Sequence, residues 1–198
     1  MSATTRARPG RQRSEAADQA ILSATLDVLA ETGYAGFTVA AVIARSGVSS
    51  ATLYRRWATK EELVVAALAS LHPEPVAIDT GSFDGDMAAL IQAMAKTMSV
   101  RRDDLAGVLA GELRRDSELR AAVDAKFLAP RLALLREILA RAEACGELAD
   151  TPSVDMAWSL VSGPMYHRAY VRGEPFTPVF LRAVTAFVIS GFRGLSGA

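Results

Sequence analysis

The sequence has few cysteines and histidines, and it lacks a long apolar run. Its 198 residues include one cysteine, Cys145, and two histidines, His72 and His167. A single cysteine excludes an internal disulfide and gives no cysteine cluster for zinc. The longest apolar run, residues 183–192, is about half of the ~20 residues needed to cross a bilayer. No apolar segment follows the arginines near residue 1, so we expect no secretory signal and a cytoplasmic location.

The motifs of an active site are also missing. Neither histidine lies near a Ser or Cys nucleophile motif, and no metal-ligand spacing or phosphate-binding loop occurs. His72 is interpreted as capping carbonyls at a helix end, and His167 as a hydrogen-bonded residue in an apolar helix. We therefore predict that the protein is not an enzyme and uses no metal and no cofactor.

The charges balance over the whole chain but not locally. Lys and Arg number 22, as do Asp and Glu, so the molecule as a whole is no polycation and any affinity for a polyanion has to come from a local patch. Residues 38–60 contain no acidic side chain and four basic ones, Arg45, Arg55, Arg56 and Lys60. Hydrophobic residues make up 51% and aromatics 7%, and no strand-like alternation occurs. The predicted fold class is all-α.

This basic stretch predicts two short helices around a glycine turn. Thr38 can cap the first helix, and Ser49 the second. Gly47 stands where the chain needs a left-handed residue. Leu53 and Trp57, four residues apart, are expected to face inward. This is the arrangement of a helix-turn-helix, whose second helix enters the major groove of DNA.

The second helix has small residues early and cationic ones late. Ser50, Ala51 and Thr52 suit close approach to bases, whereas Tyr and Arg suit phosphates and guanine edges. Thr59 and Glu62 form a capping box, which places Lys60 beside free backbone N–H groups. An ordinary helical corner is the alternative, and the absence of acidic residues favours DNA. The predicted DNA-binding residues are Thr38, Arg45, Ser49, Ser50, Ala51, Thr52, Tyr54, Arg55, Arg56 and Lys60.

The same region resembles the N-terminal signature of TetR-type transcriptional regulators. The residues that carry the resemblance are Phe37-Thr38-Val39, Ile43-Ala44, Gly47-Val48-Ser49, Thr52-Leu53-Tyr54, Trp57 and Lys60-Glu61-Glu62-Leu63. The resemblance implies that Thr38, Tyr54 and Lys60 hold the DNA backbone. It also implies that residues early in the second helix meet bases.

Three regions follow from the pattern. Residues 1–13 are an arginine-rich arm, expected to be disordered, that either enters a minor groove or is a solvated tail. Residues 14–72 are the DNA-binding domain with three helices. Residues 73–198 are a helical effector-binding and dimerisation domain. Its predicted helices span residues 82–98, 104–114 and 117–145 with a kink at Pro130, followed by a helix from Thr151 or Ser153 to residue 172, and a last one from 178 onward with Thr177 as its cap.

The last two of these helices are apolar nearly all round, so a partner should cover one side. A two-fold dimer joined by a four-helix bundle is the simplest arrangement, and a monomer that buries both helices is the alternative. TetR-type regulators dimerise in this way, and such a dimer suits a palindromic operator. The predicted interface residues are Met156, Leu160, Gly163, Tyr166, His167, Tyr170, Phe180, Val184, Phe187, Val188 and Gly191.

Apolar stripes in the middle helices fit either a plain core or an effector pocket. The tentative pocket residues are Leu90, Met94, Met98, Val108, Phe127, Leu134 and Trp158. The resemblance favours a small apolar or aromatic effector that releases DNA. We therefore predict a sequence-specific DNA-binding transcriptional regulator, acting as a repressor. The alternative is a helical ligand-binding or protein-interaction module that does not act on DNA.

Overall fold

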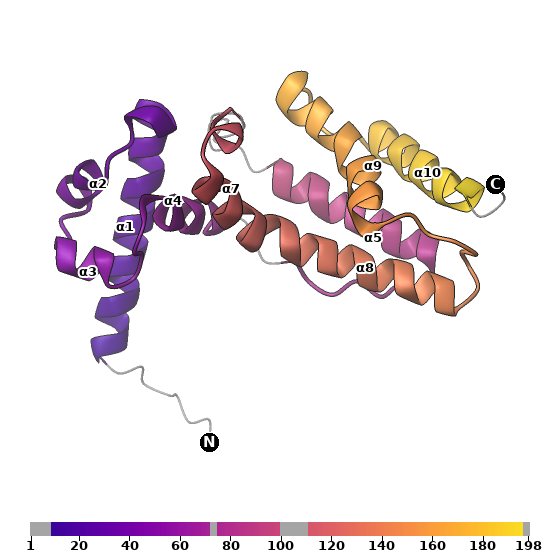
Figure 1. The fold of residues 1–198 in the computed structure, drawn as a ribbon, viewed down its shortest axis with the longest axis horizontal. Helices are drawn as coiled ribbons and strands as arrows, with labels where there is room; N and C mark the ends of the chain where they lie inside the picture. Colours follow the sequence, from indigo (N-terminus) through magenta and orange to yellow (C-terminus); the bar gives the residue numbers. More distant parts are fainter. Residues whose placement is uncertain (1–8, 72–74, 100–110, 196–198) are drawn as a thin grey trace. The chain divides into compact units, whose positions relative to one another are not determined.

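The computed structural model describes residues 9–71, 75–99 and 111–195 (Figure 1). Every regular element within these ranges is helical, which confirms the predicted all-α class. None of the described helices is both long enough and apolar enough to cross a membrane. The described residues divide into two compact units. One comprises residues up to 71 together with 111–123, and the other comprises 75–99 and 124–195.

The first unit is built around a long N-terminal helix. Helix α1 contacts both α2 and α4, and α4 packs against α7. Ile21, Leu29, Leu53 and Leu63 are among its fully buried side chains. Its elements are α1 (Pro9–Gly36), α2 (Val39–Ser46), α3 (Ser50–Tyr54), α4 (Lys60–Ala69), the 3₁₀ turn η1 (Glu112–Arg114) and α7 (Ser117–Val123).

Helix α1 begins earlier than predicted. We expected disorder through residue 13 and a start at Ser14, but the helix starts at Pro9. Proline is favoured in a first helical turn because its missing N–H would have no intrahelical partner there. The remainder of the predicted arm, residues 1–8, lies outside the described residues. Gly33, with φ 64° and ψ 176°, interrupts the helical run before it ends at Gly36.

Helix α7 belongs to the first unit, although we predicted one domain from residue 73 onward. It packs on α4, and its Leu119 is fully buried. Asp116 caps it by accepting the Leu119 N–H at 2.8 Å. The helix predicted for residues 104–114 lies mostly outside the described residues, and its described end is the turn η1.

The second unit is a bundle with one apolar core. Helix α5 contacts α8, α9 and α10, and α9 contacts α8 and α10. Thr177 caps the last helix, with its Oγ1 accepting the Phe180 N–H at 3.2 Å, as predicted. The elements are α5 (Phe83–Met98), the π-helical turn η2 (Asp124–Leu128), α8 (Ala129–Ala144), α9 (Val154–Tyr166), the π-helical turn η3 (His167–Val171) and α10 (Pro178–Leu195).

The helix predicted for residues 117–145 is a continuous helical run to Ala144, with a π-helical turn directly before Pro130. The π-helical turn η2 separates α7 from α8, and Pro130 stands in the first turn of α8. Proline cannot donate a backbone hydrogen bond to the preceding turn, which accounts for the irregular turn before it. The Arg131 side chain donates from Nη1 to the Phe127 carbonyl at 2.6 Å.

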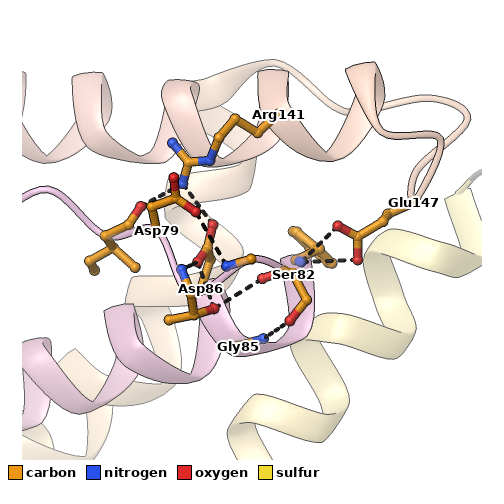
Figure 2. A network of polar contacts seen from close by, with 10 residues as sticks. Asp79, Ser82, Gly85, Asp86, Arg141 and Glu147 are labelled. Carbon is orange, nitrogen blue, oxygen red and sulfur yellow. Dashed lines mark hydrogen bonds and ion pairs between the residues drawn. The ribbon is translucent and has the colours of Figure 1, made fainter.

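A buried carboxylate fixes the start of the second unit (Figure 2). Asp86 is 3% exposed and accepts the Thr80 N–H at 2.7 Å and the Thr80 hydroxyl at 2.8 Å. Arg141 of α8 donates to its other oxygen at 2.6 Å and also to the Ile78 carbonyl. Burial alone would raise the pKa of Asp86, but the hydrogen bonds from Arg141 and Thr80 outweigh it and lower that pKa. The loop before α5 is thereby fixed to α8.

Two further contacts hold the N-terminus of α5 in Figure 2. Ser82 caps the helix by accepting the Gly85 N–H at 3.2 Å. The Phe83 N–H donates to both carboxylate oxygens of Glu147, each at 3.0 Å. The Phe83 and Gly85 N–H groups of the first turn therefore have protein partners.

We predict that Asp86→Asn destabilises the protein by about 2–4 kcal/mol, because Arg141 loses its carboxylate in a mostly buried site. Urea denaturation at pH 7 measures the loss. Asp84→Asn is the control, since Asp84 pairs with Arg193 at 2.6 Å but is half-exposed. Exposed pairs contribute little, so the control should change stability much less. Equal losses in the two variants would contradict the importance of the buried network.

The lowered pKa of Asp86 adds a pH dependence. A carboxylate whose folded pKa is depressed stabilises the fold above its unfolded pKa and loses that contribution as pH falls through the folded pKa. The stability difference between the wild type and Asp86→Asn should therefore shrink below about pH 4. A difference that is unchanged between pH 7 and pH 3 would count against this ion pair.

Candidate nucleic-acid interface

The helix-turn-helix has the predicted caps. Thr38 accepts the Ala41 N–H at 3.2 Å, and Ser49 accepts the Thr52 N–H at 3.4 Å. Gly47 ends α2 in the left-handed conformation, with φ 67° and ψ 9°. Side chains other than glycine rarely adopt this conformation without strain, so the turn requires glycine.

Helix α3 is held from behind by an apolar anchor. Leu53 is 1% exposed, and Val42 of α2 is fully buried. The Trp57 side chain is half-buried, and the backbone N–H of Trp57 donates to the Leu53 carbonyl at 3.0 Å. The predicted inward face is therefore confirmed.

The outward side of α3 carries the small and cationic residues. Ser50, Ala51 and Arg55 are exposed, and Tyr54 is 52% exposed. Thr52 is half-buried, and its hydroxyl accepts a hydrogen bond from Ser49 at 3.1 Å. Of the residues assigned to bases, Ser50 and Ala51 are thus the more accessible.

Arg45 has an acidic partner that the local sequence does not reveal. Its guanidinium donates to both oxygens of Glu31 on α1, at 2.8 and 2.7 Å. This hydrogen bond from Arg45 lowers the pKa of Glu31. Our reasoning that the cations lack acidic neighbours was wrong here, because it considered only the sequence around residues 38–60.

Arg56 is also engaged with α1. Its Nε forms an ion pair with Asp18, and Nη2 donates to the Ser14 hydroxyl at 2.9 Å. Its Nη1 donates to the Thr52 carbonyl at 3.0 Å. We predicted Arg56 as a DNA contact, but the structure turns it toward α1, where it connects the end of α3 to that helix. The guanidinium of Arg55, which directly follows α3, has no ion pair or hydrogen bond with any described residue. Of the two arginines at the end of α3, Arg55 is therefore the more available to DNA.

Lys60 stands at the start of α4 over aromatic rings. Its Nζ donates to the Tyr34 carbonyl at 3.0 Å and lies 4.0 Å from the Tyr34 ring centroid. Thr59 caps α4 by accepting the Glu62 N–H at 3.1 Å. The Glu62 carboxylate accepts the Ala58 N–H at 2.8 Å, whereas the capping box predicted that it would accept the Thr59 N–H. The ammonium is therefore held at a defined place beside the first turn.

Tyr34 is a site residue that sequence reasoning missed. It is 5% exposed, and its hydroxyl donates to Glu61 Oε1 at 2.9 Å and to Asp116 Oδ2 at 3.0 Å. Burial, followed by the hydrogen bonds to the two carboxylates, raises the pKa of the Tyr34 phenol. The Leu119 N–H, more than any other group, lowers the pKa of Asp116. No sequence signal indicated this contact, because Tyr34 and Asp116 are 82 residues apart.

The predicted pocket residues are mostly gathered in the second unit. Leu90, Met94, Leu134 and Trp158 belong to one buried cluster, and Met98 packs against it. Phe127 is half-buried in η2, and Val108 lies outside the described residues. In the described part of the chain, no group of three His, Cys, Asp or Glu side chains could hold a metal.

The predicted interface residues fall into two groups. Phe180 is half-buried, whereas Val184 and Val188 differ from the prediction, since they are 7% and 3% exposed in the core of their own unit. They face inward because one side of α10 covers α5. The remaining eight are exposed: Met156, Leu160, Gly163, Tyr166, His167, Tyr170, Phe187 and Gly191.

Two family models match the chain. Residues 21–67 match that of the bacterial regulatory proteins of the tetR family, and residues 77–188 match that of the tetracyclin repressor-like C-terminal domain. The chain belongs to the TetR family. A helix-turn-helix-type transcriptional regulator of Mycobacterium bovis is 32% identical over 170 residues, which cover 85% of this chain and 84% of the relative.

Solved structures of transcriptional regulators share the fold. A crystal structure of a TetR family transcription regulator covers 88% of this chain and 97% of its own, with 27% identity and a TM-score of 0.63. FadR from Bacillus subtilis covers 87% and 98%, with 18% identity and a TM-score of 0.65. The helix-turn-helix and the helical second unit therefore both have counterparts in this family.

The Arg45–Glu31 pair makes the DNA role of Arg45 testable. We predict that Glu31→Gln raises DNA affinity roughly twofold to tenfold and steepens its salt dependence, because Arg45 is freed for phosphate. Fluorescence anisotropy over a salt series measures both. Asp27→Asn on the same helix is the control, since it removes one negative charge without breaking a hydrogen bond to Arg45. If the two variants change affinity equally, Arg45 has no specific contact with DNA.

Proposed function

We propose that the protein is a cytoplasmic transcriptional repressor that binds a palindromic operator as a homodimer and is released by a small apolar or aromatic effector. The observation that carries the proposal is the outward face of α3, where Ser50, Ala51, Tyr54 and Arg55 are exposed while Leu53 is buried behind them. Small side chains early in a recognition helix allow its backbone to approach base edges closely. The match to the tetracyclin repressor-like domain supports the repressor role.

We assign some residues of this face to contacts with bases and others to contacts with phosphates. Ser50, Ala51 and Thr52 are assigned to bases, where hydroxyl and methyl groups read the major groove. Tyr54, Arg55 and Lys60 are assigned to phosphates, which position the protein without reading sequence. Thr38 and Ser49 cap their helices with their side chains and also lie at the exposed surface.

An exposed apolar face supports the homodimer. Phe187 is 71% exposed, Met156 55% and Leu160 43%, on the two helices predicted to form the interface. Exposed apolar side chains gathered on neighbouring helices mark an interaction surface. A two-fold dimer would present two α3 helices to half-sites about 34–36 Å apart, one helical turn of DNA.

The buried cluster around Leu90, Met94 and Trp158 supports an apolar effector. FadR, which has the same fold, was solved in complex with stearoyl-CoA, a ligand with a long apolar chain. Such a ligand releases DNA only to the extent that it binds the DNA-free conformation more tightly than the DNA-bound one. Methionine side chains are flexible, so this cluster can adjust to a ligand.

We predict that Arg55→Ala weakens operator binding roughly fivefold to fiftyfold and lowers the salt slope by about one. Anisotropy with genomic operator fragments, over a salt series, measures both values. Arg136→Ala on α8 is the control, because it removes an equally exposed positive charge from the other unit. Wild-type protein that binds no genomic fragment would leave the alternative, a helical module that does not act on DNA.

We predict that Phe187→Glu abolishes the dimer, because it places a carboxylate in an apolar contact. Sedimentation should show about twice the chain mass of 21.0 kDa for the wild type and a single chain for the variant. Val76→Glu is the control, since Val76 is 77% exposed in the loop before α5. A wild-type protein that sediments as one chain would contradict the proposed dimer.

A further inference from the structure

Arg131 differs from the other half-buried arginines of the described chain. Arg56 pairs with Asp18, Arg141 with Asp86, and Arg168 with Glu174. Arg131 is also half-buried, in the first turn of α8, but no described carboxylate lies within ion-pair distance of it. Among the described residues of the second unit, Arg131 is therefore a half-buried guanidinium without an acidic partner.

The contacts of Arg131 leave most of its hydrogen-bonding capacity unused. Nη1 donates to the Phe127 carbonyl at 2.6 Å, and the guanidinium carbon lies 5.8 Å from the Phe127 ring centroid. A guanidinium has five N–H donors, and no other side-chain hydrogen bond from Arg131 occurs among the described residues. Burial lowers the pKa of Arg131, opposed by electrostatic interactions with Tyr166 and Tyr170.

A charge in this position lacks the compensation that buried cations normally have. Removing a cation from water is unfavourable unless a paired anion or hydrogen bonds offset the loss of hydration. Arginine remains protonated even when burial lowers its pKa, so it cannot relieve this cost by becoming neutral. The site is therefore suited to bind an anion.

The surroundings indicate which anion fits. The Phe127 ring lies beside the Arg131 guanidinium, and Tyr166 and Tyr170, whose ring centroids are 5.4 Å apart, are near enough to interact with it electrostatically. Leu128 and Leu132, which flank Arg131, pack against the apolar core. The planar guanidinium matches a carboxylate with two parallel hydrogen bonds, and the rings match an apolar body.

We infer that Arg131 binds the carboxylate of a hydrophobic organic acid, and that this acid is the effector of the second unit. This inference rests on the proposed function for the effector's role in regulation, but binding of the acid is measured separately from DNA. Tyr166 and Tyr170 also belong to the exposed face proposed for the dimer, so the acid would lie at the edge of that face.

The test compares acids with their uncharged amides. Octanoate and phenylacetate are added to the full-length protein, alongside octanamide and phenylacetamide, and the Tm is recorded. At concentrations well above Kd the acids should raise the Tm by about 2–4 °C, and the amides by less. Arg131→Met should weaken acid binding roughly tenfold to a hundredfold. Arg131→Lys, which keeps the charge but loses the planar fork, should be intermediate.

Arg136→Met is the matched control, because Arg136 lies on the same helix but is exposed. It should bind the acids like the wild type. The inference is overturned if neither acid raises the Tm, if the amides match the acids, or if Arg131→Met keeps full acid affinity. It is also overturned if Arg131→Met sediments as a monomer with unchanged acid binding, because the guanidinium would then serve a partner subunit.

Operator binding of the same samples separates this inference from the proposed function. Acid binding that depends on Arg131, in a protein that binds no operator, would refute the regulator and retain the acid site. Operator binding without acid binding would retain the regulator and refute the acid site. Acids that bind through Arg131 should also weaken operator binding of the wild type and of Arg136→Met, but not that of Arg131→Met.

Discussion

Burial of Leu53 is the contact on which the DNA-reading surface depends. Helix α3 has only five residues, far fewer than an isolated helix needs to be stable in water. Its conformation therefore comes from tertiary packing and from the Ser49 cap. With Leu53 fixed inward, Tyr54 and Arg55 are left at the surface, and Leu53 is the one aliphatic side chain of α3 larger than that of alanine.

The charge pattern of this surface is set by helix α1 as much as by the helix-turn-helix. Glu31 and Asp18 of α1 take up Arg45 and Arg56, which would otherwise extend the cationic face. The consequence is a smaller basic patch around Arg55 and Lys60. Within this patch Arg55 is exposed, whereas Lys60 is half-buried and donates to the Tyr34 carbonyl.

The local features of the fold were predictable because they depend on residues close in sequence. Caps such as Thr38 and Thr59, the left-handed Gly47 and the inward Leu53 all follow from spacing within a few residues. The partners of Arg45 and Arg56 were not predictable, since they depend on how α1 packs against the motif. Likewise, the sequence showed that α10 is apolar nearly all round. It could not distinguish the buried Val184 from the exposed Phe187, because both sides of that helix are apolar.

The contact of Tyr34 with two carboxylates has a consequence for proton counting. A phenol carries a single hydrogen, so the Tyr34 hydroxyl divides one donor between Glu61 at 2.9 Å and Asp116 at 3.0 Å. Glu61 of α4 and Asp116, which caps α7, thus accept the same hydroxyl hydrogen of Tyr34. The ammonium of Lys60, whose charge lowers the pKa of Asp116, offsets the resulting excess of negative charge. If either carboxylate were removed, the Tyr34 hydroxyl would donate to the other alone. The carboxylates of Glu61 and Asp116 therefore compete for one hydrogen-bond donor.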